Sequence, residues 1–181
     1  TTVHYLAGNH DFMLGPFLKK TIGMHIHFDH LRLNVQGRAL HLHHGDGLRP
    51  GEFGYRLLRA VLRNRINQKL YKLLHPDIGV ALAHYFSYSS RYMVKRRVSD
   101  VILERYRRVA RTYHAQGSDI VIFGHTHSAE LYDYSGSLYC NTGNWMKNYT
   151  YAKMHEGVLT LWEYVAGGES KQIQAVKVAK A

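Results

Sequence analysis

The chain has 181 residues, of which 45% are hydrophobic and 20% charged, and it carries a formal net charge of +11. This length is enough to bury a core, and the composition excludes an intrinsically disordered protein. No apolar run is long enough to cross a bilayer, and Cys140, the single cysteine, excludes an internal disulfide.

The positive charge indicates an anionic partner, and nucleic acid, a phosphorylated substrate or an anionic membrane surface would each fit. Fourteen histidines point in addition toward metal binding. The cations gather in the predicted helix of residues 55–74 and in residues 95–97, and no motif for reading bases accompanies them. A nucleic-acid partner is therefore not expected.

The first third of the chain predicts two strand regions. Residues 3–7 form an apolar run typical of a short buried strand, and a loop begins at Gly8. A short helix is expected at 15–21. Apolar residues then alternate over 31–42 on either side of a turn at Gln36-Gly37, which predicts a β-hairpin whose second strand ends at the His44 loop.

Three helices are expected next, over residues 55–74, 77–94 and 99–117. In the first, leucines and other apolar residues recur at helical spacing, with arginines and lysines on the remaining faces. The third begins with Ser99 as its N-cap and closes at Gly117. Its apolar stripe consists of Ile102, Tyr106, Val109 and Tyr113.

The last third predicts strands again. Residues 119–123 form a continuous apolar strand that should be buried on both faces. Two hairpins follow, with turns near Ser135 and Glu156, and residues 166–181 are expected to be loosely held. The order of elements predicts one α/β domain over residues 1–181, with a helical cap inserted at about 51–115.

Three short motifs each lie in a loop directly after a predicted strand. They are Gly8-Asn9-His10-Asp11, His44-Gly45-Asp46 and Gly124-His125-Thr126-His127. Strand ends of an α/β sandwich converge at one edge, so loops there can assemble a site from distant parts of the sequence. The glycines allow the sharp turns that aim the neighbouring side chains at a common centre.

The side chains of these loops suit a metal site. Imidazole nitrogens and an amide oxygen favour Mn, Fe or Zn. Asn9 would offer its carbonyl oxygen and His44 a ring nitrogen. His125 and His127 are two residues apart, so on an extended backbone both would project to one side and reach two adjacent metals, or share one.

Histidine pairs with the same spacing occur twice more, at residues 25 and 27 and at residues 41 and 43. A lone pair of this kind is a weak signal, and we interpret both as surface or strand-face residues. All three loop motifs, in this order and each after a strand, are improbable as a coincidence. Together they predict a metal centre.

The three motifs resemble the last three of the five sequence blocks of calcineurin-like metallophosphoesterases, whose first two are D-x-H and G-D. The resemblance implies an αββα sandwich whose N-terminal part, with those two blocks, is missing here, so the chain alone is expected to be inactive. It implies that Asn9, His44 and His125 ligate one metal and His127 the other.

The same resemblance implies two divalent metal ions and in-line attack on phosphorus by a metal-bound hydroxide. His10 would protonate the leaving group or hold the phosphate, and Asp11 would orient the His10 ring. Two readings without hydrolysis are left open: a binding protein that lacks half of the metal site, and a merely basic, soluble surface.

Longer stretches are similar to one branch, the UDP-2,3-diacylglucosamine pyrophosphatases of lipid A synthesis. These stretches are GNHDFMLG, HHGDGLRPGEFGYRLLR, LHPDIGVALAHYFSYSSR, FGHTHSAELY and NTGNW. The branch splits the pyrophosphate of an anionic nucleotide-lipid into UMP and an acylated sugar phosphate, usually with Mn. By this resemblance the protein is expected in the cytoplasm, peripheral to the inner membrane, and a single cysteine agrees with a reducing compartment.

Four residues of the predicted cap are candidates for substrate binding: Glu52, Tyr55, Arg91 and Arg96. The alternative is that such cations only solvate exposed helix faces. One position departs from the branch, because His10 stands where its members carry arginine. A different metallophosphoesterase activity, on another nucleotide or lipid headgroup, therefore stays open.

Overall fold

Three β-sheets organise the part of the chain that the computed structural model describes, which is residues 1–11, 13–48, 53–93 and 100–178, with only the backbone given for 86–93. The largest sheet has the order β3-β4-β5-β7-β6, in which β4, β5 and β7 run parallel and the two edge strands antiparallel. Its strands are β3 (His30–Val35), β4 (Arg38–His43), β5 (Ile120–Phe123), β6 (Glu130–Asp133) and β7 (Leu138–Asn141).

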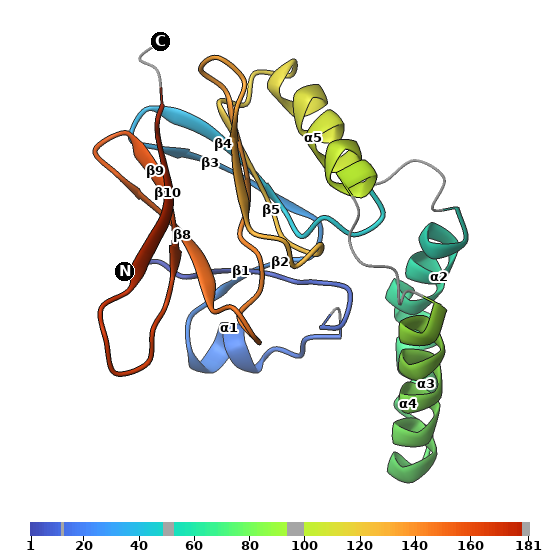
Figure 1. Ribbon diagram of the computed structural model, residues 1–181. Helices are drawn as coiled ribbons and strands as arrows, with labels where there is room; N and C mark the ends of the chain where they lie inside the picture. The colour runs from blue at the N-terminus through green and yellow to red at the C-terminus, as the bar shows by residue number, and fades with distance from the viewer. Residues whose placement is uncertain (12, 49–52, 94–99, 179–181) are drawn as a thin grey trace.

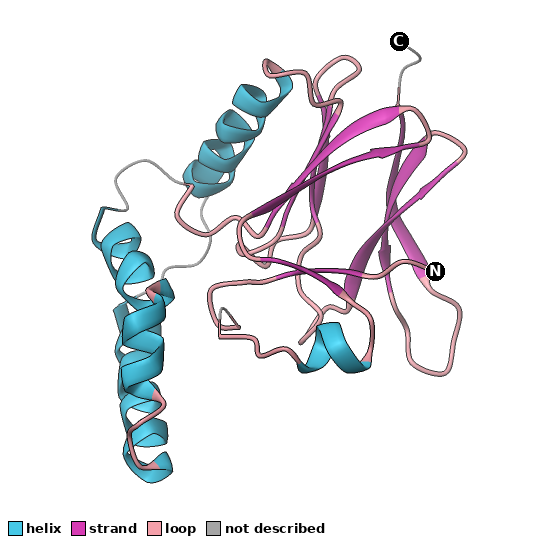
Figure 2. Ribbon diagram, turned by 180° about the vertical axis from the view of Figure 1, so that it is seen from behind, coloured by secondary structure: helices cyan, strands magenta, loops and turns pink. Residues whose placement is uncertain are grey.

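The second sheet is an antiparallel layer in the order β10-β9-β8. It consists of β8 (Thr150–His155), β9 (Val158–Glu163) and β10 (Lys171–Lys177). Its inner face packs on the five-stranded sheet through Leu159, Leu161 and Val178, which contact Leu40 and Ile120. Figure 2 shows the two sheets facing each other. The apolar cluster contains residues of both sheets.

Helix α5 (Asp100–His114) covers the other face of the five-stranded sheet (Figure 1). Side chains along β5 alternate between the layers, since Ile120 faces the second sheet while Val121 and Phe123 pack with Tyr106 of α5. The order helix, sheet, sheet confirms the predicted α/β class and the apolar stripe predicted for this helix. Of the residues expected in the cap, those of α5 therefore belong to the core.

Three other helices project away from the sheets as an arm (Figure 1). This helical arm consists of α2 (Phe53–Arg63), α3 (Arg65–Tyr71) and α4 (Pro76–Met93). A single helix was predicted over most of α2 and α3. The chain instead breaks at Asn64, which has extended dihedrals and whose side chain accepts hydrogen bonds from the backbone N–H groups of Ile66 and Asn67 as the N-cap of α3.

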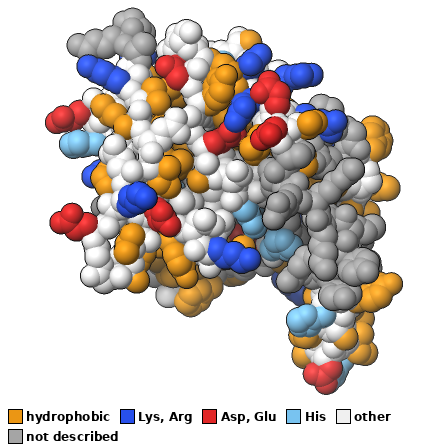
Figure 3. All heavy atoms as spheres, viewed as in Figure 1, with side chains coloured by type: hydrophobic (Ala, Val, Ile, Leu, Met, Phe, Trp, Pro, Cys, Tyr) orange, Lys and Arg blue, Asp and Glu red, His pale blue; other side chains and the backbone are white. Residues whose placement is uncertain are grey.

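The apolar stripe of the helical arm is exposed, and Phe53 and Leu73 keep 84% and 81% of their surface in contact with solvent. Hydrophobic side chains accordingly appear on the surface of the arm in Figure 3. The described helices include none that combines the length and the hydrophobicity of a membrane span.

Two terminal segments differ from the predictions. The tail was expected to be loose, but β10 pairs with β9 along its length and Val178 is buried in the core. The first strand, β1 (His4–Leu6), was expected to be buried. It is only half-buried, because it pairs with β2 (His25–His27) in a separate two-stranded sheet beside α1 (Phe17–Thr21) and does not enter the five-stranded one.

His41 is a buried histidine of the core, 2% exposed, and its ring stacks on Tyr113 at 3.9 Å and on His30 at 5.4 Å. Within the described residues neither ring nitrogen has a hydrogen-bond partner. Burial lowers the pKa of His41 to about 4, helped by the charges of His30, Arg32 and His43 and opposed by Asp29. The neutral ring is therefore a packing element, as expected for a strand-face residue.

Stability should fall in mild acid because of His41. In the unfolded chain His41 takes up a proton near pH 6.5, whereas in the folded chain it does so only near pH 4. The contribution of the neutral ring to the free energy of unfolding is therefore complete above pH 6.5 and decreases as the pH falls from 6.5 to 4. Between pH 7.5 and pH 5 the loss should be about 2 kcal/mol. Urea unfolding of wild type and His41→Phe at both pH values tests this: the variant should lose about that much less stability, whereas the exposed His84→Phe should match wild type. Equal losses in all three proteins would refute the assignment.

Candidate active site

Two of the three predicted loops leave adjacent parallel strands at the same end. His43 and Phe123, the last residues of β4 and β5, are paired in register. The chains stay together beyond the strands, since the Gly124 N–H donates to the His44 carbonyl at 3.0 Å. The loop after β1 reaches the same place, because Asn9 Oδ1 lies 2.9 Å from His44 Nε2.

The structure thus brings together Asn9, His44 and His125, which were predicted as ligands of one metal. The rings of His44 and His125 lie 5.3 Å apart between centroids, at 69° to each other. His127 and His10 lie near enough to His44 to influence its ionisation. Among the described residues, no group of three or more histidine, cysteine or carboxylate side chains is arranged to hold a metal ion.

Two glycines make this close approach possible. A Cβ at Gly8 would lie 2.9 Å from His44 Cε1 and 3.1 Å from Asp11 Oδ1, so a side chain there would push the loops apart. Gly45 has a φ of +111°, and a Cβ there would lie 3.1 Å from the Cβ of His125. Glycine is therefore needed at both loops for the donor atoms to meet.

The backbone of the Gly124–His127 loop differs from the extended form assumed in the sequence analysis. His125 and His127 have φ values of 65° and 58°, in the left-handed region that side chains other than glycine rarely adopt. The turn is held by the Thr126 N–H, which donates to the Gly124 carbonyl at 2.7 Å. Asn141 Nδ2 donates to the same carbonyl at 2.7 Å. Such strain concentrates at functional sites, where surrounding contacts maintain it.

His44 is in the protonation state that a metal ligand requires. Burial lowers its pKa below the usual histidine value, and the charges of His127 and His10 lower it further, while Asp46 and Asp11 oppose the shift only in part. The ring is therefore neutral near pH 7, with its Nε2–H donating to Asn9 Oδ1. A metal ion bound between the two atoms would take the place of that proton. The amide oxygen of Asn9 beside it is a second neutral donor, so this set fits a divalent transition metal.

Asp11 was expected to orient the ring of His10. Its Oδ2 instead accepts a hydrogen bond from the Tyr5 hydroxyl, and its buried Oδ1 has no hydrogen-bond partner among the described residues. This bond, with burial and the charge of Asp11, raises the pKa of Tyr5 to about 12. In this structure Tyr5 fixes the carboxylate, and His10 is exposed.

Asp46 connects the His44 loop to the helical arm. Its side chain is 1% exposed and pairs with Arg59 Nε at 3.1 Å and Arg63 at 3.8 Å. Tyr55, predicted to bind substrate, donates its hydroxyl hydrogen to Asp46 Oδ2 at 2.9 Å. Burial would raise the pKa of Asp46, but Arg59, the Tyr55 hydroxyl, His44 and Arg63 together lower it.

The other three predicted substrate residues are not placed by the structure. Glu52 and Arg96 lie outside the described residues, and for Arg91 only the helical backbone within α4 is described. Their proposed contacts stay predictions.

Sequence reasoning missed two residues that support the site. Tyr5 was assigned only to a strand, although it lies two positions before the Ala7-Gly8 step and points at Asp11. Asn144 donates from Nδ2 to the His127 carbonyl at 3.3 Å, and its Oδ1 accepts from the backbone N–H groups of Lys147 and Asn148. Asn144 directly follows a glycine in the sequence, and this pair of residue types is typical of such a turn.

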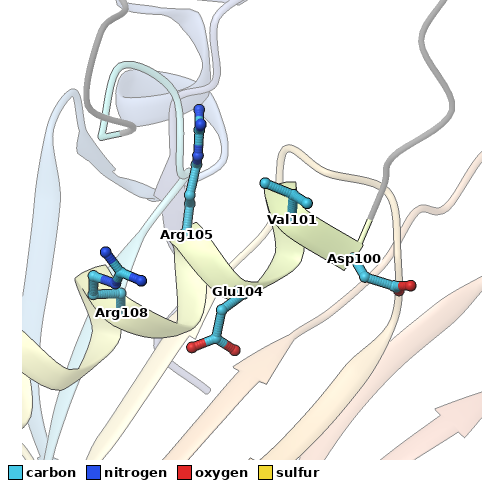
Figure 4. A pocket seen from close by; sticks show the side chains of 5 residues that line it. All are labelled: Asp100, Val101, Glu104, Arg105 and Arg108. Carbon is cyan, nitrogen blue, oxygen red and sulfur yellow. The ribbon is translucent and has the colours of Figure 1, made fainter.

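A surface hollow along α5 lies apart from these loops. It is lined by Asp100, Val101, Glu104, Arg105 and Arg108. Figure 4 shows all five on one helix, with Arg105 and Glu104 pointing to opposite sides. Among the described residues, those that line the hollow all come from this one helix and none belongs to the three loops, so the hollow is not assigned to the candidate site.

Comparison with known proteins decides the family. Residues 1–129 match the calcineurin-like phosphoesterase family, and this stretch contains all three loops. The chain belongs to this family. The metallophosphoesterase fold predicted from the motifs is thereby confirmed.

Curated members of the calcineurin-like phosphoesterase family are similar over most of the chain. The UDP-2,3-diacylglucosamine hydrolase of Psychromonas ingrahamii is 27% identical over 167 residues, which are 88% of this chain and 66% of that protein. The enzyme of the same name from Porphyromonas gingivalis is 30% identical over 141 residues, 69% of this chain and 54% of that protein. The chain thus spans roughly half to two thirds of the length of these relatives.

Among solved structures, Vacuolar Protein Sorting 29 from Cryptosporidium parvum aligns with 97% of this chain and 69% of its own. The identity is 13% and the TM-score 0.47.

Proposed function

We propose that the protein to which this chain belongs hydrolyses the pyrophosphate of UDP-2,3-diacylglucosamine to UMP and the acylated sugar phosphate. The observation that carries the chemistry is the meeting of Asn9, His44 and His125 from three separate loops, with 2.9 Å between Asn9 Oδ1 and His44 Nε2. The likeness to UDP-2,3-diacylglucosamine hydrolases supports the substrate.

The residues of the three loops would share the work. Asn9, His44 and His125 would hold one divalent metal ion and His127 the other, with Mn as the favoured metal and Fe or Zn as alternatives. When bound, two such ions supply Lewis acidity and neutralise charge on the phosphoryl oxygens. The neutral state of His44 and the glycine at position 8 both fit this role.

His10 is the residue best placed to move a proton at the leaving group. Its side chain is exposed beside the His44 loop, where a substrate oxygen can approach it. A histidine can donate a hydrogen bond to the phosphate from a ring N–H and can pass that proton to a leaving group. Asp11 and Tyr5 would then act on the shape of the loop, not on the His10 ring.

The helical arm supports an amphiphilic substrate at the surface of the inner membrane. Its exposed apolar residues include Phe53, Leu57, Ile66 and Leu73. The arginines of α2 bond inward, since Arg56 Nε donates to the Gly47 carbonyl at 3.0 Å and Arg59 pairs with Asp46. The apolar stripe is thereby left available to contact acyl chains or the cytoplasmic surface of the inner membrane.

A second candidate is hydrolysis of a different nucleotide or lipid headgroup at the same metal centre. His10 favours it, because the resembling branch carries arginine at this position. A histidine offers one ring nitrogen to a phosphate, whereas an arginine offers a planar fork, so the two prefer different phosphate geometries.

Release of UMP from UDP-2,3-diacylglucosamine in the presence of Mn²⁺ tests the proposal. The full natural polypeptide containing this chain should release UMP, and chelation should stop it. Cleavage of bis(p-nitrophenyl) phosphate without release of UMP would retain the metal centre and favour the second candidate. If chelation stopped the hydrolysis of neither substrate, both candidate functions would be contradicted.

A further inference from the structure

Three histidines gather on one face of the β1–β2 strand pair. His4 is paired in register with His25, and His27 follows two residues after His25, so all three side chains lie on the same side of this parallel pair. The ring centroid of His4 is 5.1 Å from that of His25 and 5.2 Å from that of His27. His4 and His25 are exposed and His27 is partly exposed, so a solute can reach the cluster.

Two of these rings already present nitrogens at the spacing of metal ligands. His4 Nδ1 and His27 Nε2 share a hydrogen bond of 3.0 Å, and a metal ion would replace the proton that lies between them. Two nitrogens bound about 2.0–2.1 Å from one ion lie about 2.9 Å apart at a right angle and about 3.4 Å apart at the tetrahedral angle. The observed separation falls between these values. His25 does not yet converge with the pair, and a rotation of its exposed side chain would supply a third ligand.

The backbone under the cluster is firmly connected. The His25 N–H donates to the Val3 carbonyl at 2.9 Å, and the Ala7 N–H donates to the His27 carbonyl at 2.8 Å. These bonds fix the two strands relative to each other at both ends of the pair. A pair of ligands held by such a frame loses little entropy when it binds an ion.

We propose that His4 and His27, with His25 as a third ligand, form a surface site for a late divalent transition metal such as Zn²⁺, separate from the three-loop centre. Imidazole nitrogens without carboxylates select Zn²⁺, Ni²⁺ or Cu²⁺ over Mg²⁺ and Ca²⁺. Burial and the charges of His4 and His25 lower the pKa of His27, which favours the neutral ring that a metal ion needs. Bound metal would cross-link β1 to β2, and β1 leads into the loop of Asn9.

Calorimetric titration of the metal-free full natural polypeptide with Zn²⁺ at pH 7.5 tests the site. The titration is done in His125→Ala, which weakens one of the two metal positions of the three-loop centre, and compared with the variant that also carries His4→Ala and His27→Ala. The triple variant should bind one Zn²⁺ fewer than His125→Ala, or bind that ion at least about tenfold more weakly, because the remaining imidazole loses its partner ligand. Zinc should also raise the melting temperature of the His125→Ala protein by more than that of the triple variant.

The matched control is His155→Ala, which removes an exposed histidine from β8 in the same background. It should leave the titration unchanged. Mg²⁺ should give no heat at this site. Equal Zn²⁺ binding in the triple variant, or equal weakening by His155→Ala, would overturn the proposal. Both outcomes are independent of hydrolysis, so failure here would leave the proposed function intact.

Discussion

Replacing His125 with alanine should reduce hydrolysis about a thousandfold or more. His125 comes from the end of the central strand β5 and stands against His44, so its loss removes one donor of the three that meet there. A metal ion supplies several kcal/mol of stabilisation to the charge that develops on phosphorus, and each 1.36 kcal/mol is a factor of ten in rate. The measurement is kcat/KM of the full natural polypeptide with saturating Mn²⁺.

Two companion variants distinguish a lost ligand from a damaged fold. Asn9→Ala should cause a comparable loss, because its amide oxygen shares the centre with His44. His155→Ala, on the outer sheet, should retain wild-type turnover. Circular dichroism and melting temperature of His125→Ala should stay close to wild type, because the substitution removes only a side chain at the end of a loop and keeps the Cβ. Activity of His125→Ala within a factor of ten of wild type would contradict the site assignment.

Local rules were sufficient to predict the strands that carry the site. Alternating apolar residues and turn residues identified β3–β4, β6–β7 and β8–β9, and the uninterrupted apolar run identified β5. The ends of β4 and β5 therefore located two loops of the site. That these strands are adjacent and parallel follows from the packing of the whole sheet, and no local pattern contains that information.

The errors arose where tertiary contacts outweigh composition. Residues 171–177 contain lysine and glutamine and looked like a tail, yet they add a strand because β9 has an edge to pair and Val178 fills the core. The break at Asn64 was hidden by the surrounding leucines, since an N-cap asparagine interrupts the backbone without changing the hydrophobic period.

The role of Asp46 could not be read from its motif. The sequence placed Asp46 beside His44 in one of the three motifs and assigned it no role, whereas its contacts are those of an anchor for α2. Tyr55, Arg59 and Arg63 recur at four-residue spacing, so they share one face of the helix, and all three converge on this single carboxylate. Arg59 also pairs with Asp29 at 3.1 Å, and Arg63 donates to the Phe28 carbonyl at 2.5 Å.

Asp46→Ala should therefore destabilise the protein by about 3–5 kcal/mol, the loss that follows when one partner of a buried ion pair is removed. Arg59 and Arg63 would keep their charges close together with only Asp29 to offset them, and the Tyr55 hydroxyl would lose its acceptor. Urea unfolding at pH 7.5 measures the loss. Asp77→Ala removes a carboxylate that is 91% exposed on α4 and should cost less than about 0.5 kcal/mol.

Asp46→Asn separates charge from shape in the same network. Asparagine retains an acceptor oxygen for Tyr55 but not the attraction for the two arginines, so its stability should fall between those of wild type and Asp46→Ala. Because the folded pKa of Asp46 is lowered, the contribution of the carboxylate is present above its ordinary value of 3.8 and is lost as the pH falls through the lower folded value. A cost below about 1 kcal/mol for Asp46→Ala would show that the arm is held to the sheets by other contacts and that Asp46 is free for the chemistry of the neighbouring His44.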